Sequence, residues 1–363
     1  MISVPSPAGQ LADRSAVSPG PAGPDASVPA GPQTSGPTEQ EWRSAVAAVQ
    51  DVPPGGRVLL LCHVNPDGDA LGSMLGFGLG LRRLGGRSIQ ASFPGSAELP
   101  PALHGMPGSD LLVPAEAVWD DPDLILCFDV ASASRLGPLA DRMSSSRSIV
   151  VDHHASNTRF GGIHLIDPAA AATSMVVERL LDRLGVGLDA QIAECLYVAL
   201  VTDTGSFRFD MTTPAVHQMA ARLLATGIRP AEIARRVLDS RPFGAVRLFG
   251  EALRRSVLEP TAAGGLGLVW TYATLADLDR HDQRPYVLEA LIDSVRCTVE
   301  ADVSCVLKQI AEAGWAVSMR SKGGVDVSRV AVALGGGGHR HAAGFTGTGS
   351  AEDVIAMIRT QLG

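Results

Sequence analysis

The stretch from residue 59 to residue 73, LLLCHVNPDGDALGS, constrains the fold of this chain most strongly. An apolar run ends at His63, a turn of Asn-Pro-Asp-Gly-Asp follows, and small residues then continue in a helical pattern. A strand, breaker residues and a helix in this order are typical of the start of a βαβ unit. Open α/β sheets bind ligands at the C-terminal ends of their parallel strands. The polar side chains of this turn are therefore candidate site residues.

Three side chains on this turn can bind a metal ion. His63, Asp67 and Asp69 lie within seven residues, and Gly68 makes the backbone between the two carboxylates more flexible. Imidazole and carboxylate groups at such short spacing indicate one half of a metal site. The structural alternative is a polar loop with an aspartate cap. Further ligands elsewhere in the chain would favour the metal site over this loop.

Strand-like and helix-like segments alternate from residue 57 onward. This alternation predicts an α/β fold with a mostly parallel sheet flanked by helices on both faces. We assign it to a first domain, residues 41–227. Its predicted strands are residues 58–62, 89–92, 124–128 and 148–151, and its predicted helices are residues 71–84, 173–184, 190–201 and 215–225.

The remaining parts of the chain have different patterns. Residues 1–40 contain eight prolines and no hydrophobic period, which predicts a disordered tail. Residues 228–258 keep a helical period and are predicted to be a helical connector. Residues 259–363 are predicted to form a smaller α/β domain, with strands at 267–272, 304–308 and 315–320 and helices at 286–295 and 351–362.

We expect the second half of the metal site at three other places where an apolar strand or helix ends in a turn. Asp129 follows the strand-like run 124–128, Asp152-His153-His154 ends the next one, and Asp203 ends a predicted helix. The ends of parallel strands share one edge of the sheet, so these groups can meet the first turn. Carboxylates gather in a low-dielectric site only when cations neutralise them. Oxygen ligands with a few imidazoles suit Mn²⁺ better than Mg²⁺, and so many ligands favour two metals. The structural alternative for the triad is a helix cap with surface histidines.

A glycine-rich motif stands near the C-terminus. Four glycines, residues 335–338, precede His339 and Arg340, and Arg320 and Lys322 lie upstream. Glycine amides can form an anion-binding nest, and the cationic side chains suit a phosphate. A flexible glycine linker is the structural alternative.

Charge and composition restrict the partners. A net charge of −8 argues against a broad surface for duplex nucleic acid, although short nucleic acids remain compatible with it. Five scattered cysteines without a CxxC pair favour a reducing compartment. No apolar stretch has the length of a membrane span, and no secretory signal is visible. We therefore expect a cytoplasmic protein without a membrane partner.

Together these motifs resemble the DHH phosphoesterase superfamily, whose defining triad matches residues 152–154. Within it, the chain is similar to the family of oligoribonucleases and 3′,5′-adenosine bisphosphate (pAp) phosphatases. The resemblance covers about residues 45–363 and follows the order of the family's motifs. The glycine run matches the signature of the DHH-associated C-terminal domain.

The resemblance implies a role for each matching residue. It implies one metal held by His63, Asp67 and Asp129, and a second held by Asp69, Asp129, His153 and Asp203. His154 would stabilise charge or donate a proton at the scissile phosphate, and Asp152 would orient a histidine. The far end of the substrate would be bound by Arg320, Gly336, Gly337, Gly338, His339 and Arg340. The family usually uses two Mn²⁺, with Mg²⁺ as an alternative, and is expected to form homodimers.

The expected function is a metal-dependent phosphohydrolase that cleaves short RNA oligonucleotides to mononucleotides and converts pAp to AMP. One alternative is a phosphodiesterase for cyclic dinucleotides or their linear products. Another is a RecJ-like exonuclease for single-stranded DNA, which the acidic chain disfavours. A family II pyrophosphatase is disfavoured by the glycine motif. A nucleotide-binding regulatory module without catalysis is the alternative outside the enzymes, and the intact set of candidate ligands argues against it.

Overall fold

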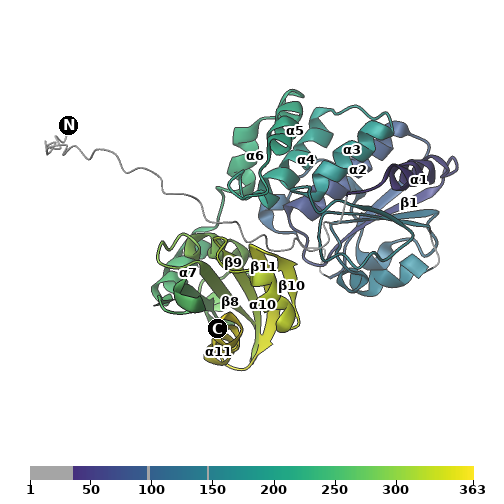
Figure 1. Ribbon diagram of the computed structural model, residues 1–363. Helices are drawn as coiled ribbons and strands as arrows, with labels where there is room; N and C mark the ends of the chain where they lie inside the picture. The colour runs from purple at the N-terminus through teal and green to yellow at the C-terminus, as the bar shows by residue number, and fades with distance from the viewer. Residues whose placement is uncertain (1–35, 96–98, 145–146) are drawn as a thin grey trace, which may run out of the picture. The chain divides into compact units, whose positions relative to one another are not determined.

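The computed structural model describes residues 36–95, 99–144 and 147–363 (Figure 1). The predicted disordered tail lies outside the described residues up to position 35. The first two residues of helix α1, Glu39–Gln50, lie within the predicted tail. The reason is a capping box, in which the Thr38 hydroxyl accepts from the Glu41 amide and the Glu41 carboxylate accepts from the Thr38 amide.

The first sheet confirms the predicted parallel architecture. Its strand order is β2-β1-β3-β4-β5, and all neighbouring pairs are parallel. Four of the strands were predicted, whereas the short edge strand β5 was not. The strands are β1 (Arg57–Cys62), β2 (Ser88–Ser92), β3 (Leu124–Phe128), β4 (Ser148–Asp152) and β5 (Ile163–Ile166).

Both faces of this sheet are buried, which explains the continuous apolar runs of its strands. Leu60 packs into the larger core beneath the helices, whereas Leu59 and Leu61 pack into a smaller core on the opposite face. Loops with short 3-10 helices, including η4 (Ala133–Ser144), cover that second face. The larger core is covered by α1 and by α2 (Gly68–Leu84), α3 (Thr173–Arg183), α4 (Ala190–Asp203) and α5 (Pro214–Leu224).

Helices α2 and α4 pack closely because α2 has a glycine at every fourth position. A Cβ atom at Gly68 would lie 2.5 Å from Thr202 Oγ1, and one at Gly72 would lie 2.4 Å from the carbonyl oxygen of Cys195. This close contact brings the start of α2, with Asp67 and Asp69, next to the end of α4, with Asp203.

A methyl group at the α2–α4 contact should therefore destabilise the protein. We expect Gly72→Ala to lower the free energy of unfolding by about 2 kcal/mol, because the new Cβ meets rigid backbone. Urea unfolding measures the effect. The matched control is Gly250→Ala in the middle of helix α7 (Phe243–Arg254), where a Cβ meets nothing within 4 Å. That change should stabilise the helix by about 1 kcal/mol, and equal effects of both substitutions would contradict the packing argument.

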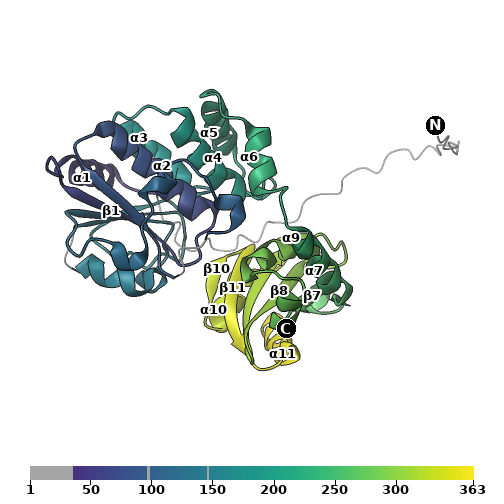
Figure 2. The ribbon, with the colours of Figure 1, turned by 180° about the vertical axis from the view of Figure 1, so that it is seen from behind.

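The second sheet is mixed and lies in the C-terminal part of the chain (Figure 2). Its strand order is β10-β11-β9-β8-β7-β6, and only β7 and β8 pair in parallel. The second sheet thus contains three strands more than the sequence pattern indicated. The strands are β6 (Val257–Glu259), β7 (Leu268–Ala273), β8 (Val303–Ala311), β9 (Gly314–Ser321), β10 (Gly337–His339) and β11 (Ala342–Thr348).

Two groups of helices form cores with this sheet. Helices α10 (Val327–Ala333) and α11 (Ala351–Leu362) share one core with it. The second core contains α7, α8 (Leu275–Arg280), the 3-10 helix η6 (Pro285–Ala290) and α9 (Leu291–Val295). The single helix predicted for residues 286–295 is therefore a 3-10 turn followed by a short α-helix.

The two helices within the predicted connector, residues 228–258, pack into different cores. Ile233 of helix α6 (Pro230–Val237) packs into the first core, whereas Leu248 and Ala252 of α7 pack into the second. Strand β6, which ends at Glu259, already belongs to the second sheet. Among the described residues, no helix combines the length and apolar character needed to cross a bilayer.

Candidate metal centre

The candidate site lies where the strand order of the first sheet reverses. His63 directly follows β1 and Asp129 directly follows β3, and these two strands are neighbours. Asp152 is the last residue of β4, and His153 and His154 come next. In a doubly wound sheet of order 2-1-3-4-5, the switch point between β1 and β3 is the expected position of a ligand.

One group of possible ligand atoms comes from His63, Asp67 and Asp129. The Nδ1–H of His63 donates to the carbonyl oxygen of Val64 at 2.8 Å, which leaves the Nε2 lone pair facing the carboxylates. His63 Nε2 lies 3.5 Å from Asp129 Oδ2 and 4.0 Å from Asp67 Oδ2. Asp67 also caps helix α2, and it uses the other oxygen, Oδ1, to accept from the amides of Asp69 and Ala70.

A second group comes from Asp69, His153 and Asp203, with Asp129 beside it. The Nδ1–H of His153 donates to the carbonyl oxygen of Ala170 at 3.1 Å. Its Nε2 lies 3.2 Å from Asp203 Oδ2, 3.6 Å from Asp129 Oδ1 and 3.8 Å from Asp69 Oδ2. The two oxygens of Asp129 thus face different histidines, so this carboxylate belongs to both groups.

The donor set fits divalent cations. Two ligands about 2.1 Å from a shared metal are separated by roughly 3–4 Å, and the distances above, 3.2 to 4.0 Å, fall in this range. Burial, together with Asp129 as a charged neighbour, raises the pKa values of Asp69 and Asp203 well above the usual range. Among the described residues, no Lys or Arg nitrogen lies within 4.0 Å of these carboxylates. A metal would supply the missing positive charge.

The carboxylates are held in place by residues that the sequence patterns did not single out. The Thr173 amide donates to Asp69 Oδ2 at 2.7 Å, and its hydroxyl donates to Asp129 Oδ1 at 2.9 Å. Ser73 and the Ser174 amide donate to Asp69 Oδ1. Asp129 has φ 59°, a left-handed conformation that is uncommon outside glycine and is found at functional sites. Thr173 begins helix α3, and no local sequence signal connects it with the two acids.

His154 differs from the other two histidines because its Nδ1 faces a carboxylate. Nδ1–H donates to Asp152 Oδ1 at 2.8 Å, which leaves Nε2 free. Burial opposes a charged ring, but the hydrogen bond to Asp152 and the charge of Asp129 raise the pKa of His154 to about 10. Asp152 is itself held by the amide group of Asn157, which donates to Oδ2 at 2.5 Å. Asn157 is another residue that the sequence patterns missed.

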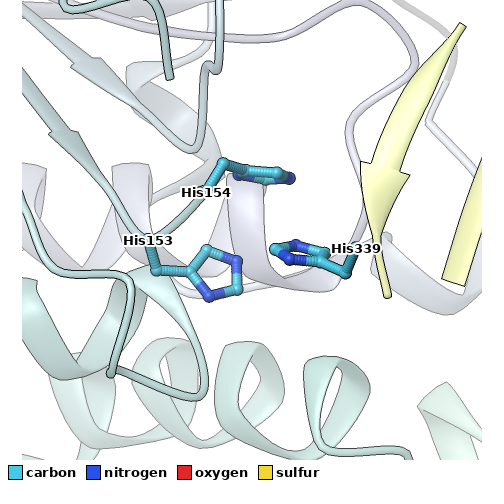
Figure 3. Close-up of side chains that lie close together, drawn as sticks. All are labelled: His153, His154 and His339. Atoms are coloured by element: carbon cyan, nitrogen blue, oxygen red, sulfur yellow. The ribbon is translucent and has the colours of Figure 1, made fainter. Parts of the chain in front are cut away.

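His339 of strand β10 completes a group of three imidazoles (Figure 3). Its ring stacks on that of His154, with centroids 4.6 Å apart, and lies 5.2 Å from the ring of His153. Burial, followed by the positive charge of His154, lowers the pKa of His339 to about 3. The pKa values of the two stacked histidines are therefore shifted in opposite directions.

The glycine motif forms a β-hairpin and not the expected open nest. The amides of Gly335 and Gly336 donate to the carbonyls of Val332 and Ala331 and so end helix α10. Gly337 and Gly338 pair with β11 in strand β10, where a Cβ at Gly338 would come within 2.5 Å of Ala343. Because the Gly336 amide donates to a backbone carbonyl, substrate binding by Gly336 stays a prediction from the sequence.

The two predicted arginines have different surroundings. Arg340 is exposed and its guanidinium faces the carbonyl oxygen of Gly323 at 3.3 Å, so it is not part of the histidine group. Arg320 of β9 lies beside Ala342 in the sheet and donates to the Met319 carbonyl. Burial lowers the pKa of Arg320, and nearby carboxylates, including Asp203, partly offset this effect.

The chain matches two protein families. Residues 57–200 match the N-terminal domain of the DHH family, and residues 270–362 match the DHHA1 domain. These ranges contain the first sheet with its candidate ligands up to His154, and most of the second sheet. Asp203 lies three residues beyond the first match.

The chain is also similar to individual proteins. It is 35% identical, over 85% of its length and 90% of the other's, to the bifunctional oligoribonuclease and PAP phosphatase NrnA of Thermus thermophilus. An exopolyphosphatase-related protein from Bacteroides fragilis has the same fold, with a TM-score of 0.79, 24% identity and coverage of 90% and 96%. RecJ from Thermus thermophilus, in complex with Mn²⁺, aligns with a TM-score of 0.52 at 13% identity, over 89% of this chain and 55% of RecJ.

Proposed function

Because the chain belongs to the DHH family of phosphoesterases, in the group of bifunctional oligoribonucleases and PAP phosphatases, we propose that it hydrolyses short RNA oligonucleotides and dephosphorylates pAp. The observation that carries the proposal is the shared position of Asp129. One of its oxygens lies 3.5 Å from His63 Nε2, and the other lies 3.6 Å from His153 Nε2. A carboxylate between two sets of ligands is what hydrolysis with two metals requires.

We assign two Mn²⁺ to this cluster, with Mg²⁺ as the alternative. His63, Asp67 and Asp129 would hold one ion, and Asp69, Asp129, His153 and Asp203 would hold the other. Divalent cations bound there would supply Lewis-acid chemistry that neutralises phosphate charge and makes water a better nucleophile near neutral pH.

The protein's own groups would complete the reaction. His154, protonated and held by Asp152, would point its free Nε2–H at the phosphate, where it stabilises negative charge and donates a proton to the leaving oxygen. Asn157 keeps Asp152 in the orientation that this hydrogen bond needs. Arg320 would bind a second phosphate of the substrate as a fixed cation. No covalent intermediate with the protein is needed.

Turnover of four substrates tests this proposal. The purified protein with Mn²⁺ should hydrolyse pAp and a dinucleotide RNA quickly and a long DNA strand slowly, and excess chelator should abolish both fast reactions. The products, AMP from pAp and mononucleotides from RNA, are separated by chromatography. Rapid digestion of long DNA would favour the RecJ-like alternative, and preference for a cyclic dinucleotide would favour the other phosphodiesterase. Bound metal without any turnover would favour the regulatory module.

Three further expectations stay predictions from the sequence. They are a homodimer, a cytoplasmic location and, as the alternative function, hydrolysis of cyclic dinucleotides or their linear products.

A further inference from the structure

A cavity of about 650 Å³ begins beside Asp203. It is lined by the neighbours of this residue, Thr202 and Gly205, and also by Tyr286 and Arg320 of the C-terminal part of the chain. Its volume is in the range of cavities that bind small organic ligands. Apart from Arg320, none of its lining residues has a role in the site described above.

Three arginines line this cavity, and their guanidinium groups are not neutralised. Arg208, Arg241 and Arg320 have no carboxylate oxygen within 4.0 Å among the described residues. Arg208 donates to the Gly205 carbonyl at 2.6 Å, and Arg241 lies 5.6 Å from the centre of the Phe249 ring. Arg320 is the more buried of the three, whereas Arg208 and Arg241 are exposed. The cavity thus has one inner and two outer cations that can bind anions.

The carboxylates of the cavity make a nucleotide more suitable than a simple polyanion. Glu289 is neutralised by Lys308, whose Nζ lies 2.6 Å from both of its oxygens. Asp239 and Asp293 also line the cavity. These oxygens can accept hydrogen bonds from ribose hydroxyls, which a chain of phosphates alone does not offer.

The backbone holds Arg208 at a fixed place relative to Asp203. Gly205, Ser206 and Phe207 all have left-handed φ values, 56°, 60° and 62°, and the turn ends where the amides of Arg208 and Phe209 donate to the Thr204 carbonyl. Strain of this kind, in two consecutive residues other than glycine, is found where the surrounding structure fixes a functional conformation.

We propose that this cavity binds the part of an oligonucleotide that extends beyond its second phosphate. Arg208 and Arg241 would contact the third phosphate. The inference rests on the proposed function and divides its two activities between different residues. pAp has two phosphate groups, which the metal centre and Arg320 can accept. A trinucleotide with a 5′-phosphate has a third phosphate, which the two outer arginines that line the cavity can bind.

The test compares kcat/KM for pAp and for a 5′-phosphorylated RNA trinucleotide. The double variant Arg208→Ala, Arg241→Ala should lose about thirtyfold on the trinucleotide, mainly through KM, because two charged hydrogen bonds to phosphate are removed. The loss on pAp should be below about threefold, since no phosphate is left unbound. The salt dependence of the trinucleotide KM should also weaken, by ~0.7 in the log–log slope for each phosphate that the variant no longer binds.

The matched control is Arg254→Ala, because Arg254 is exposed and lies outside the cavity. This variant should leave both substrates and the salt slope unchanged. Equal losses on pAp and the trinucleotide, or no loss on the trinucleotide, would overturn the inference while the proposed function stands. If the unaltered protein hydrolyses neither pAp nor the trinucleotide, the proposed function is overturned, and the inference with it.

Discussion

Replacement of Asp129 by asparagine is expected to lower kcat for pAp and for a dinucleotide by about a thousandfold or more. Asparagine has the same shape and keeps an oxygen that can accept from the Thr173 hydroxyl. It lacks the negative charge and one of the two oxygens that face His63 and His153. Since Asp129 belongs to both groups of ligands, its loss should weaken both metal sites at once.

Metal content and turnover measured together test this prediction. Elemental analysis after gel filtration should find fewer bound metals in Asp129→Asn than in the unaltered protein, and thermal unfolding should show that the fold is kept. Asp110→Asn is the matched control, because Asp110 forms an exposed ion pair with Arg82 away from the cluster. Activity within twofold of the unaltered protein, with full metal content, would exclude Asp129 as the shared ligand.

The second large effect is expected for His154→Gln, which should lower kcat by about a hundred- to a thousandfold with little change in bound metal. His154 donates to Asp152 through Nδ1 and keeps a free Nε2, unlike His63 and His153, whose Nε2 atoms face carboxylates. Glutamine can donate a hydrogen bond but cannot transfer a proton to a leaving oxygen.

The metal content of this variant separates two roles for His154. Its ring lies close to His153 and His339, and three imidazoles of this kind could also hold an ion. Loss of metal on substitution would show that His154 is a ligand and would contradict the proton-donor assignment. His164→Gln serves as the control, since His164 only donates to the Phe160 carbonyl and should leave both metal and activity unchanged.

Much of the first sheet could be predicted from the sequence because its signals are local. The runs 58–62 and 124–128 are apolar throughout, as strands buried on both faces must be, and the helix after the first turn ends at Gly85 as expected. The second sheet was harder to predict. Strand β10 contains two glycines and one histidine. Glycine has no side chain, so this strand lacks the alternation of apolar and polar residues by which strands are predicted. Helix α7 has the pattern of any amphipathic helix, so its packing on the second core could not be inferred.

The acids and histidines of the site could be found from the sequence because they follow strands that end on one edge of a parallel sheet. Which of their atoms face one another depends on the three-dimensional packing. It placed Thr173 against two carboxylates, Asn157 against Asp152, and Arg208 and Arg241 around the cavity next to Asp203. These residues are polar and carry no distinctive signal in their own segments. Contacts of this kind arise from the packing of helices and loops over long sequence separations, and no local pattern encodes them.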